Sequence, residues 1–288
     1  AAPKDGAQRA NREGLGLADV ATGAKGKITA AGDSDQTLPR GAAQAGSRDG
    51  RQLWFTVASR QKWERGIVRY DRPTHTLTEL AKDGRNYSSL RLSKDGSTIL
   101  MNVANGNRPA DIYAGNADLG NLHRVAESNP QLASRKIGPT ELVSYLDADG
   151  HGKKAVVFYP ADYEKGKAYP TVFEVYEDFF DDNYDVRANV LTGHGYVVVH
   201  PSVDFDIGYP GEAWLKGVGA AANKLIEMGV ADSARLGLQG QSYGGYATTL
   251  LLTQPARSKA ACHHPAKADL RTFHTDTPRP GAPPVTAP

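Results

Sequence analysis

Short hydrophobic runs that alternate with polar turns dominate the first part of the chain. The turn Asp49–Arg51 precedes a strand-like run at 52–57, and the similar turn Asp95–Ser97 precedes another at 98–103. The two turns lie 46 residues apart. Asp-Gly turns followed by strands at a period of about 40–50 residues are typical of the four-stranded blades of a β-propeller.

A second pattern, a strand followed by a polar turn and another strand, recurs in step with these turns at 16–29, 66–80 and 111–125. A closed propeller needs roughly four to eight blades. The residues up to 128 have room for about two to two and a half blades of this period. The sequence therefore predicts a partial, propeller-like all-β region over 1–128, with an irregular small sheet as the alternative.

The pattern changes after the polar linker Glu127–Pro130, whose proline disfavours a helix at this point. Strand-like runs then alternate with helical periodicity, which favours a mostly parallel sheet covered by helices on both faces. The expected strands are 142–146, 155–159, 171–176, 196–200, 235–239 and 259–263, and the expected helices are 186–193, 212–228 and 243–252. We assign 129–264 to this α/β domain. The remaining segment, 265–288, ends with five prolines in eleven residues and is expected to be a disordered or extended tail.

The composition is that of a folded chain. Its 288 residues suggest two domains, at about 150 residues each. Hydrophobic residues make up 40% and charged residues 23%, which excludes a disordered or membrane-embedded chain. The net charge of +2 gives no field that would attract nucleic acid or a membrane surface, and we expect neither as a partner.

Cys262 is the only cysteine, which excludes an internal disulfide and a CxxC site. We expect no metal and no cofactor. The chain starts at Ala1 with no initiator methionine and no apolar leader, so no signal peptide is visible. The compartment and the oligomeric state therefore stay open.

One sequence motif is typical of a catalytic serine. The run Gly240–Gly244 fits G-x-S-x-G and lies between an expected strand and an expected helix. In such a nucleophile elbow the serine, here Ser242, takes a strained backbone conformation, and the residues two before and two after it must be small. The turn places the hydroxyl at the start of the helix, where the dipole and the Tyr243 N–H stabilise negative charge. A phosphate-binding glycine turn is the alternative, but no complete P-loop or dinucleotide fingerprint accompanies it.

Several segments in order resemble the prolyl oligopeptidase family of serine peptidases, with the closest likeness to its acylaminoacyl-type branch. They are 129–130, 141–145, 175–177, 207–212 and 237–246, and the resemblance spans roughly 45–262. It implies a β-propeller followed by an α/β-hydrolase domain, incomplete here, with short peptides as substrates.

The resemblance implies roles for three residues. Ser242 is expected to be the nucleophile, the backbone N–H of Tyr243 one oxyanion donor, and the Tyr176 hydroxyl the second donor. Gly240, Gly244 and Gly245 form the elbow. A tyrosine at the carboxyl end of a strand can reach the crevice where open α/β sheets bind ligands. Without the resemblance, Tyr176 is as well explained as a packed aromatic with a hydrated hydroxyl.

The acid and base partners of the serine are the part of the pattern that is missing. In this fold an Asp or Glu and then a His follow the nucleophile, and the family places them well over fifty residues later. Only 46 residues follow Ser242. His263 and His264 fall within or just after the next expected strand, as a buried pair that would be costly without hydrogen bonds, and His274 falls in the tail. We therefore expect no triad Asp or His in this chain, a truncation or a change of reading frame, and weak or no activity.

The remaining features favour ordinary structure. The acidic run 177–185 can be a solvated loop or a holder for a substrate amino terminus. The segment 147–150 begins like a calcium loop but lacks the closing Glu, so a hairpin turn is expected. His151, His194 and His200 show no spacing typical of metal ligands.

Three interpretations of function stay open. The first is a serine peptidase, the second an esterase with the same elbow, and the third a non-catalytic pseudoenzyme or propeller-type binding module. The missing Asp and His favour the third, whereas the propeller-like repeat and the run 240–246 argue against the second.

Overall fold

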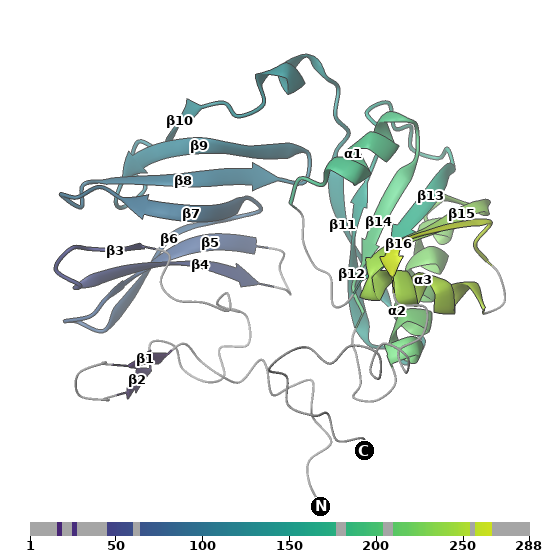
Figure 1. Cartoon of the computed structure of the whole chain (residues 1–288), viewed down its shortest axis with the longest axis horizontal. Coiled ribbons are helices and arrows are strands. Elements are labelled where there is room, and N and C mark those ends of the chain that lie inside the picture. The colour runs from purple at the N-terminus through teal and green to yellow at the C-terminus, as the bar shows by residue number, and fades with distance from the viewer. Residues whose placement is uncertain are drawn as a thin grey trace, which may run out of the picture. The chain divides into compact units, whose positions relative to one another are not determined.

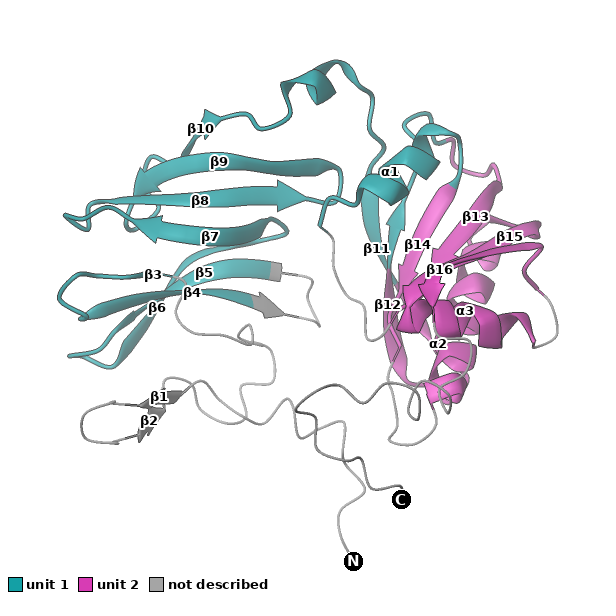
Figure 2. Ribbon diagram, viewed as in Figure 1, with its two compact units in different colours: residues 1–143, 156–163, 180–196 teal, residues 144–155, 164–179, 197–288 magenta. Residues whose placement is uncertain are grey.

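A computed structural model of the chain describes residues 45–59, 64–176, 183–203, 210–253 and 257–266, together with the short antiparallel pair β1 (Gly16–Ala18) and β2 (Lys25–Lys27). The chain divides into two compact units (Figure 2). The first comprises 1–143, 156–163 and 180–196, and the second comprises 144–155, 164–179 and 197–288.

Two four-stranded antiparallel sheets lie in the first unit, next to each other (Figure 1). One has the order β3-β4-β5-β6, from β3 (Ala45–Gly46), β4 (Gln52–Ser59), β5 (Glu64–Asp71) and β6 (Thr76–Asp83). The other has the order β10-β9-β8-β7, from β7 (Asn86–Leu92), β8 (Thr98–Asn105), β9 (Arg108–Asn116) and β10 (His123–Ala126). The predicted all-β, blade-like region is confirmed.

The two Asp-Gly turns are built by the same hydrogen bonds. In the first turn, Asp49 Oδ1 accepts from the Ser47 hydroxyl at 2.6 Å and from the Arg51 N–H at 3.0 Å. In the second turn, Asp95 Oδ1 accepts from the Ser93 hydroxyl at 2.5 Å and from the Ser97 N–H at 3.2 Å. The side chains of each turn therefore supply hydrogen-bond partners for its own backbone. This is why the turns could be predicted from the sequence alone.

The two sheets share one hydrophobic core. Trp54 and Ile67 from the first sheet pack in the same cluster as Ile99 and Met101 from the second, and all four are fully buried. The Trp54 indole N–H donates to the Ala117 carbonyl at 2.9 Å, which adds a polar tie between the sheets. Burial of such side chains stabilises by about 1.5–3 kcal/mol each.

The third large sheet has six strands in the order β11-β12-β14-β13-β15-β16. β13 runs parallel to β14 and β15, and β15 runs parallel to β16. The strands are β11 (Thr140–Leu146), β12 (Gly152–Phe158), β13 (Tyr169–Glu174), β14 (Val197–Pro201), β15 (Ala231–Ser242) and β16 (Ala260–Ala266). The helical elements are a 3-10 turn (Pro130–Ser134), α1 (Val186–Gly193), α2 (Pro210–Glu227) and α3 (Tyr243–Leu252).

The sheet and its helices are those of the predicted α/β-hydrolase domain. All five residues of β14 are buried, as expected for a parallel strand covered on both faces. α2 buries one stripe that includes Trp214, Val218 and Leu225. Within the described residues, no helix has the length and apolar character that crossing a membrane requires.

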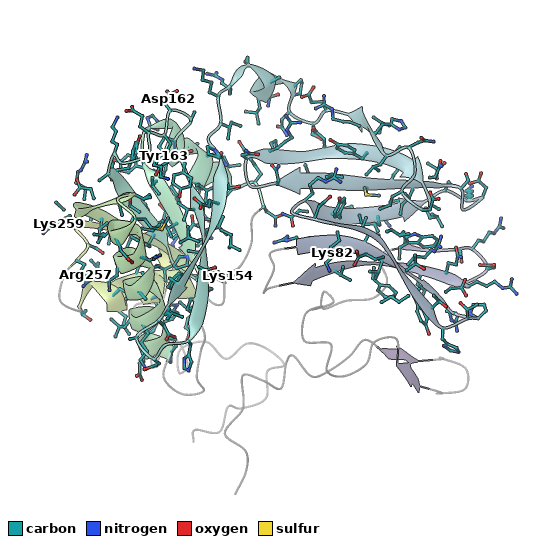
Figure 3. All side chains as sticks on the ribbon, turned by 180° about the vertical axis from the view of Figure 1, so that it is seen from behind. Lys82, Lys154, Asp162, Tyr163, Arg257 and Lys259 are labelled. Carbon is teal, nitrogen blue, oxygen red and sulfur yellow. The ribbon has the colours of Figure 1, made fainter. Side chains whose placement is uncertain are left out.

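One expectation about the last strand is wrong. β16 was expected to bury its two histidines, but Cys262 and His263 are exposed and His264 is only partly buried. The reason is that β16 is the outermost strand of the described sheet, so its residues have no neighbouring strand on one side. Lys259, just before it, is exposed at the outer margin of the unit (Figure 3). The predicted tail lies outside the described residues beyond Ala266, and the proposed boundary at 128/129 stays a prediction.

Candidate functional site

The chain turns sharply where β15 meets α3. Ser242 ends the strand, Tyr243 begins the helix, and the Ser242 backbone has φ +56° and ψ −116°. This conformation is strained for any residue with a side chain, at a cost of about 1–3 kcal/mol. It is the strained serine backbone that the motif predicted.

The three glycines of the elbow are required by close backbone contacts. A Cβ on Gly240 would lie 2.1 Å from the Gly244 carbonyl oxygen, and a Cβ on Gly244 would lie 2.0 Å from the Val175 carbonyl oxygen. A Cβ on Gly245 would lie 2.2 Å from the Ala266 Cβ. No real side chain fits at these distances, so the elbow holds β13, β15, α3 and β16 together at one point.

The Ser242 side chain is exposed at this point. It makes no capping hydrogen bond to α3, although serine often caps a helix in this position. Tyr243 is the first helical residue. The N–H groups of the first turn of a helix have no acceptor within the helix itself. The N-terminus of a helix carries about half a positive elementary charge. The corner can therefore stabilise an oxyanion that forms next to Ser242.

Tyr176 follows β13 and reaches the same corner. A Cβ on Gly244 would lie 3.2 Å from the Tyr176 ring, so the ring adjoins the elbow. The Tyr176 side chain is 37% exposed, and its backbone carbonyl accepts a 2.8 Å hydrogen bond from the Trp214 indole. The structure thus brings together Ser242, Tyr243 and Tyr176, the three residues that the sequence singled out.

A polar row that the sequence analysis missed lies in the strands leading to this corner. Glu174 of β13 is in register with Gln239 of β15, and the Gln239 side-chain amide donates to the Glu174 carboxylate at 3.5 Å. On the other side, His200 Nε2 lies 3.4 Å from the same carboxylate oxygen. Glu174 and His200 are buried, and a buried charge requires such partners. The signal that was available is a glutamate inside the apolar run 171–175.

The two histidines that follow the serine within the described residues do not reach it. His263 of β16 is in register with Gly240, two residues before Ser242. In the described part of the chain, neither His263 nor His264 makes a hydrogen bond to Ser242. His274 and most of the acidic run 177–185 lie outside the described residues. Asp185, the last residue of that run, caps α1 by accepting from the Ala188 N–H at 2.9 Å.

One group of possible metal ligands lies in the hairpin turn between β11 and β12, but ammonium groups already contact it. Asp147, Asp149 and His151 have their ligand atoms within 4.8 Å of one another. Lys153 lies 3.2 Å from Asp147, and Lys216 lies 2.6 Å from Asp149. Burial opposes ionisation of Asp147, but hydrogen bonds from the His151 N–H and Lys153 hold its pKa below the usual value. The arrangement is that of the expected hairpin turn.

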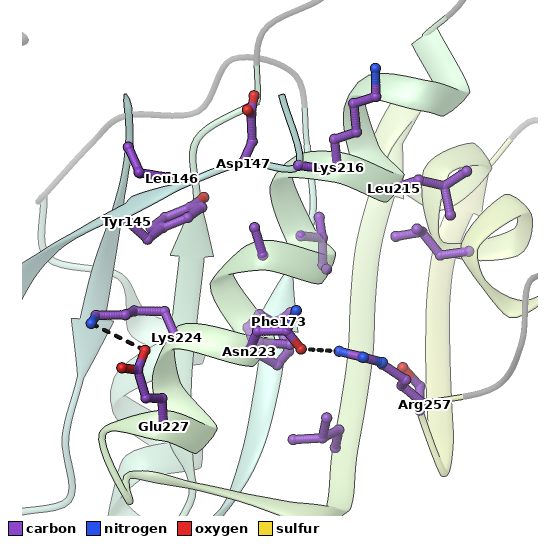
Figure 4. Close-up of a pocket in the computed structure, with 18 of the residues that line it drawn as sticks. Tyr145, Leu146, Asp147, Phe173, Leu215, Lys216, Asn223, Lys224, Glu227 and Arg257 are labelled. Carbon is purple, nitrogen blue, oxygen red and sulfur yellow. Dashed lines mark hydrogen bonds and ion pairs between the residues drawn. The ribbon is translucent and has the colours of Figure 1, made fainter. Parts of the chain in front are cut away.

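A separate cavity of about 1000 Å³ lies in the second unit. Its lining includes buried Phe173 and Leu238 and, among the polar groups, the Lys224–Glu227 ion pair at 3.3 Å (Figure 4). Ser242, Tyr243 and Tyr176 do not line it. The elbow is therefore at a different place from this cavity.

Comparison with known proteins gives a consistent result. Residues 183–283 match the prolyl oligopeptidase family. An uncharacterized peptidase, YuxL of Bacillus subtilis, is 24% identical over 203 residues, which is 65% of this chain and 31% of that protein. The chain therefore spans about a third of the length of this relative.

Solved structures share the fold. A puromycin-hydrolyzing peptidase of Mycobacterium tuberculosis matches with a TM-score of 0.69 and 21% identity, over 88% of this chain and 42% of that one. An acylaminoacyl peptidase of Pyrococcus horikoshii matches with a TM-score of 0.71 and 17% identity, over 92% of this chain and 42% of that one. These likenesses show a fold in which part of a propeller is followed by an α/β-hydrolase domain.

Proposed function

Because the chain belongs to the prolyl oligopeptidase family of serine peptidases, we propose that it carries the nucleophile and the oxyanion donors of a peptidase site. The reaction is hydrolysis of a peptide bond in a short peptide through an acyl-enzyme. The observation that carries the proposal is the positive φ of Ser242, a strained backbone at the junction of strand and helix. Strain of this kind is retained where function requires it.

The proposed reaction has the steps of acyl transfer to a serine. Ser242 Oγ attacks the peptide carbonyl carbon and gives its proton to a base, and the carbonyl oxygen takes up the negative charge. The Tyr243 N–H and the Tyr176 hydroxyl donate to that oxygen. The C–N bond then breaks, the amine leaves with a proton, and water hydrolyses the ester on Ser242.

We also propose that this chain by itself reacts slowly. A serine hydroxyl needs a general base, and no described histidine is hydrogen-bonded to Ser242. Loss of a triad residue lowers kcat by roughly 10⁴–10⁶, while about 10³–10⁴ over water is retained by the oxyanion donors and binding. The same observation favours a second candidate, a non-catalytic chain that binds peptides.

A fluorophosphonate probe tests the first candidate, because it forms a covalent bond with an activated serine. We expect an adduct on the peptide that contains Ser242, detected by mass spectrometry, and none in Ser242→Ala. Ser233→Ala is the matched control, since Ser233 is an exposed serine of the same strand. Absence of an adduct on Ser242 both with and without added imidazole as a base, or equal labelling of other serines, contradicts the peptidase proposal and favours the non-catalytic one.

Two further measurements define the chemistry. Peptide nitroanilides and short-chain nitrophenyl esters distinguish a peptidase from an esterase, and turnover of esters alone contradicts the peptidase assignment. Imidazole added to the solution should accelerate labelling of Ser242, because it supplies a base and no histidine among the described residues is hydrogen-bonded to this serine. A labelling rate that does not respond to imidazole contradicts the missing-base explanation.

A further inference from the structure

Trp214 lies next to the candidate site but cannot touch a substrate. It belongs to α2, its side chain is fully buried, and its indole N–H donates to the Tyr176 carbonyl at 2.8 Å. That hydrogen bond holds the peptide plane that follows Tyr176. The direction of the Tyr176 side chain depends on this backbone, since Tyr176 lies beyond the end of β13 and outside its ladder.

The Trp214 ring also contacts the first turn of α3. Its centroid lies 4.9 Å from that of Tyr243 in an edge-on arrangement, and 5.9 Å from that of Tyr246. Such aromatic pairs contribute about 0.5–1.5 kcal/mol beyond the area they bury. One side chain thus contacts both segments that carry the proposed oxyanion donors.

α2 is itself held in place on either side of Trp214. A Cβ on Gly211 would lie 2.9 Å from Leu250 of α3, and a Cβ on Gly217 would lie 2.8 Å from the Val203 side chain and 3.0 Å from the Ser202 carbonyl oxygen. These glycines let the helix approach its neighbours closely. The indole therefore extends from a helix that has little freedom to shift.

We propose that Trp214 is a positioning residue for the oxyanion site, acting on Tyr176 through the hydrogen bond to its carbonyl. This inference rests on the proposed function, in which the Tyr176 hydroxyl donates to the oxyanion. Removing one oxyanion donor costs about 10²–10³ in rate. Loss of the indole N–H leaves Tyr176 present but less well placed, so a smaller loss, of about tenfold, is expected.

The test compares two buried tryptophans. Trp214→Phe removes the indole N–H and keeps an aromatic ring in the core. Trp54→Phe is the matched control, because Trp54 is equally buried and also donates to a backbone carbonyl, that of Ala117 in the all-β sheets. The second-order rate of fluorophosphonate labelling at Ser242 should fall about tenfold in Trp214→Phe and stay within twofold in Trp54→Phe.

A double-mutant cycle with Tyr176→Phe separates positioning from general destabilisation. If Trp214 acts through Tyr176, its substitution should lower the labelling rate less than threefold in the Tyr176→Phe background, against about tenfold in the wild type. Equal losses in both backgrounds, or an unchanged rate in Trp214→Phe alone, overturn the inference and leave the proposed function standing. A wild-type chain that is not labelled overturns both.

A folded variant is needed for the comparison. If Trp214→Phe shows no cooperative unfolding transition, 3-benzothienylalanine introduced at position 214 keeps the bicyclic shape and removes only the N–H. The same tenfold loss is expected for it, and a rate equal to that of the wild type overturns the inference.

Discussion

The Asp-Gly turns of the all-β sheets and the elbow of the hydrolase sheet both contain a residue at positive φ, but they are held in different ways. In the second Asp-Gly turn the residue is Gly96, with φ +76°. The turn is closed by hydrogen bonds within the segment itself, and the nearest atom to a Cβ on Gly96 would be a Leu92 methyl carbon 4.0 Å away.

In the elbow the positive φ falls on Ser242, which makes no capping hydrogen bond. The turn is held instead by close backbone contacts. Gly240 meets the Gly244 carbonyl across the turn, and Gly244 meets the Val175 carbonyl of a segment distant in sequence, so neither glycine has room for a side chain. A local turn is thus specified by side chains that hydrogen-bond, and the elbow by side chains that are absent. Substitutions should therefore be tolerated very differently in the two places.

The largest effect is expected for Gly244→Ala. The new methyl group would lie 2.0 Å from the Val175 carbonyl oxygen, so backbone must move. We expect a loss of about 3 kcal/mol in the free energy of unfolding, measured by chemical denaturation, and loss of labelling at Ser242. Gly219→Ala in α2 is the control, since no atom lies within 4 Å of its added methyl; helix propensity should make that variant about 1 kcal/mol more stable. An unchanged denaturation midpoint for Gly244→Ala would show that the elbow can relax.

A gain in stability is expected for Ser242→Gly. Glycine relieves the strain of φ +56° and ψ −116°, worth about 1–3 kcal/mol, and loses part of this through the greater entropy of the unfolded chain. A net gain of about 1 kcal/mol over Ser242→Ala should appear in thermal unfolding, although both variants lack the nucleophile. Equal stability of the two variants contradicts the presence of strain at Ser242.

A smaller loss is expected for Gly96→Ala. The space around the position is open, so the cost comes only from the left-handed backbone, at about 1 kcal/mol. Gly84→Ala serves as control, because it also has open space and its φ is not positive; its stability should stay within about 0.5 kcal/mol. A loss for Gly96→Ala as large as that for Gly244→Ala would remove the distinction between the two turns.

The smallest effect is expected for Asp95→Asn and depends on pH. Hydrogen bonds from the Ser93 hydroxyl and from the Ser97 N–H and hydroxyl lower the pKa of Asp95 from 3.8 to about 2. A carboxyl whose pKa is lower in the folded state stabilises the fold above its unfolded pKa, and this contribution is lost as pH falls through the folded pKa. The melting temperatures of wild type and variant should therefore differ above about pH 4 and converge near pH 2. A difference that is constant with pH contradicts the assignment.

Helices and turns whose stabilising contacts lie close together in the sequence could be predicted. α1 and α3 have the bounds that the periodicity predicts, and the Asp-Gly turns fall where the repeat places them. β15 is longer than expected. It begins at Ala231, which pairs with Tyr169 of β13, and it includes Asp232 and Ser233, residue types of low strand propensity. Pairing with β13 therefore extends the strand beyond what its sequence predicts.

Contacts between distant segments could not be predicted in the same way. The periodicity of α2 places Trp214 on its buried stripe, but nothing in the sequence pairs its indole with the Tyr176 carbonyl. The exposure of His263 also depends on the position of β16 in the sheet, and the run Ala260–His264 by itself resembles a buried strand. Burial of such strands is a property of their neighbours.

The last strand of the described sheet has a consequence for assembly. β16 contains Pro265, which has no N–H to offer. Backbone N–H groups along a strand point alternately to its two sides, so only every second residue of β16 could donate to a strand that joined the sheet at this side. Proline in an outer strand and the exposed Lys259 beside it both act against uncontrolled edge-to-edge association.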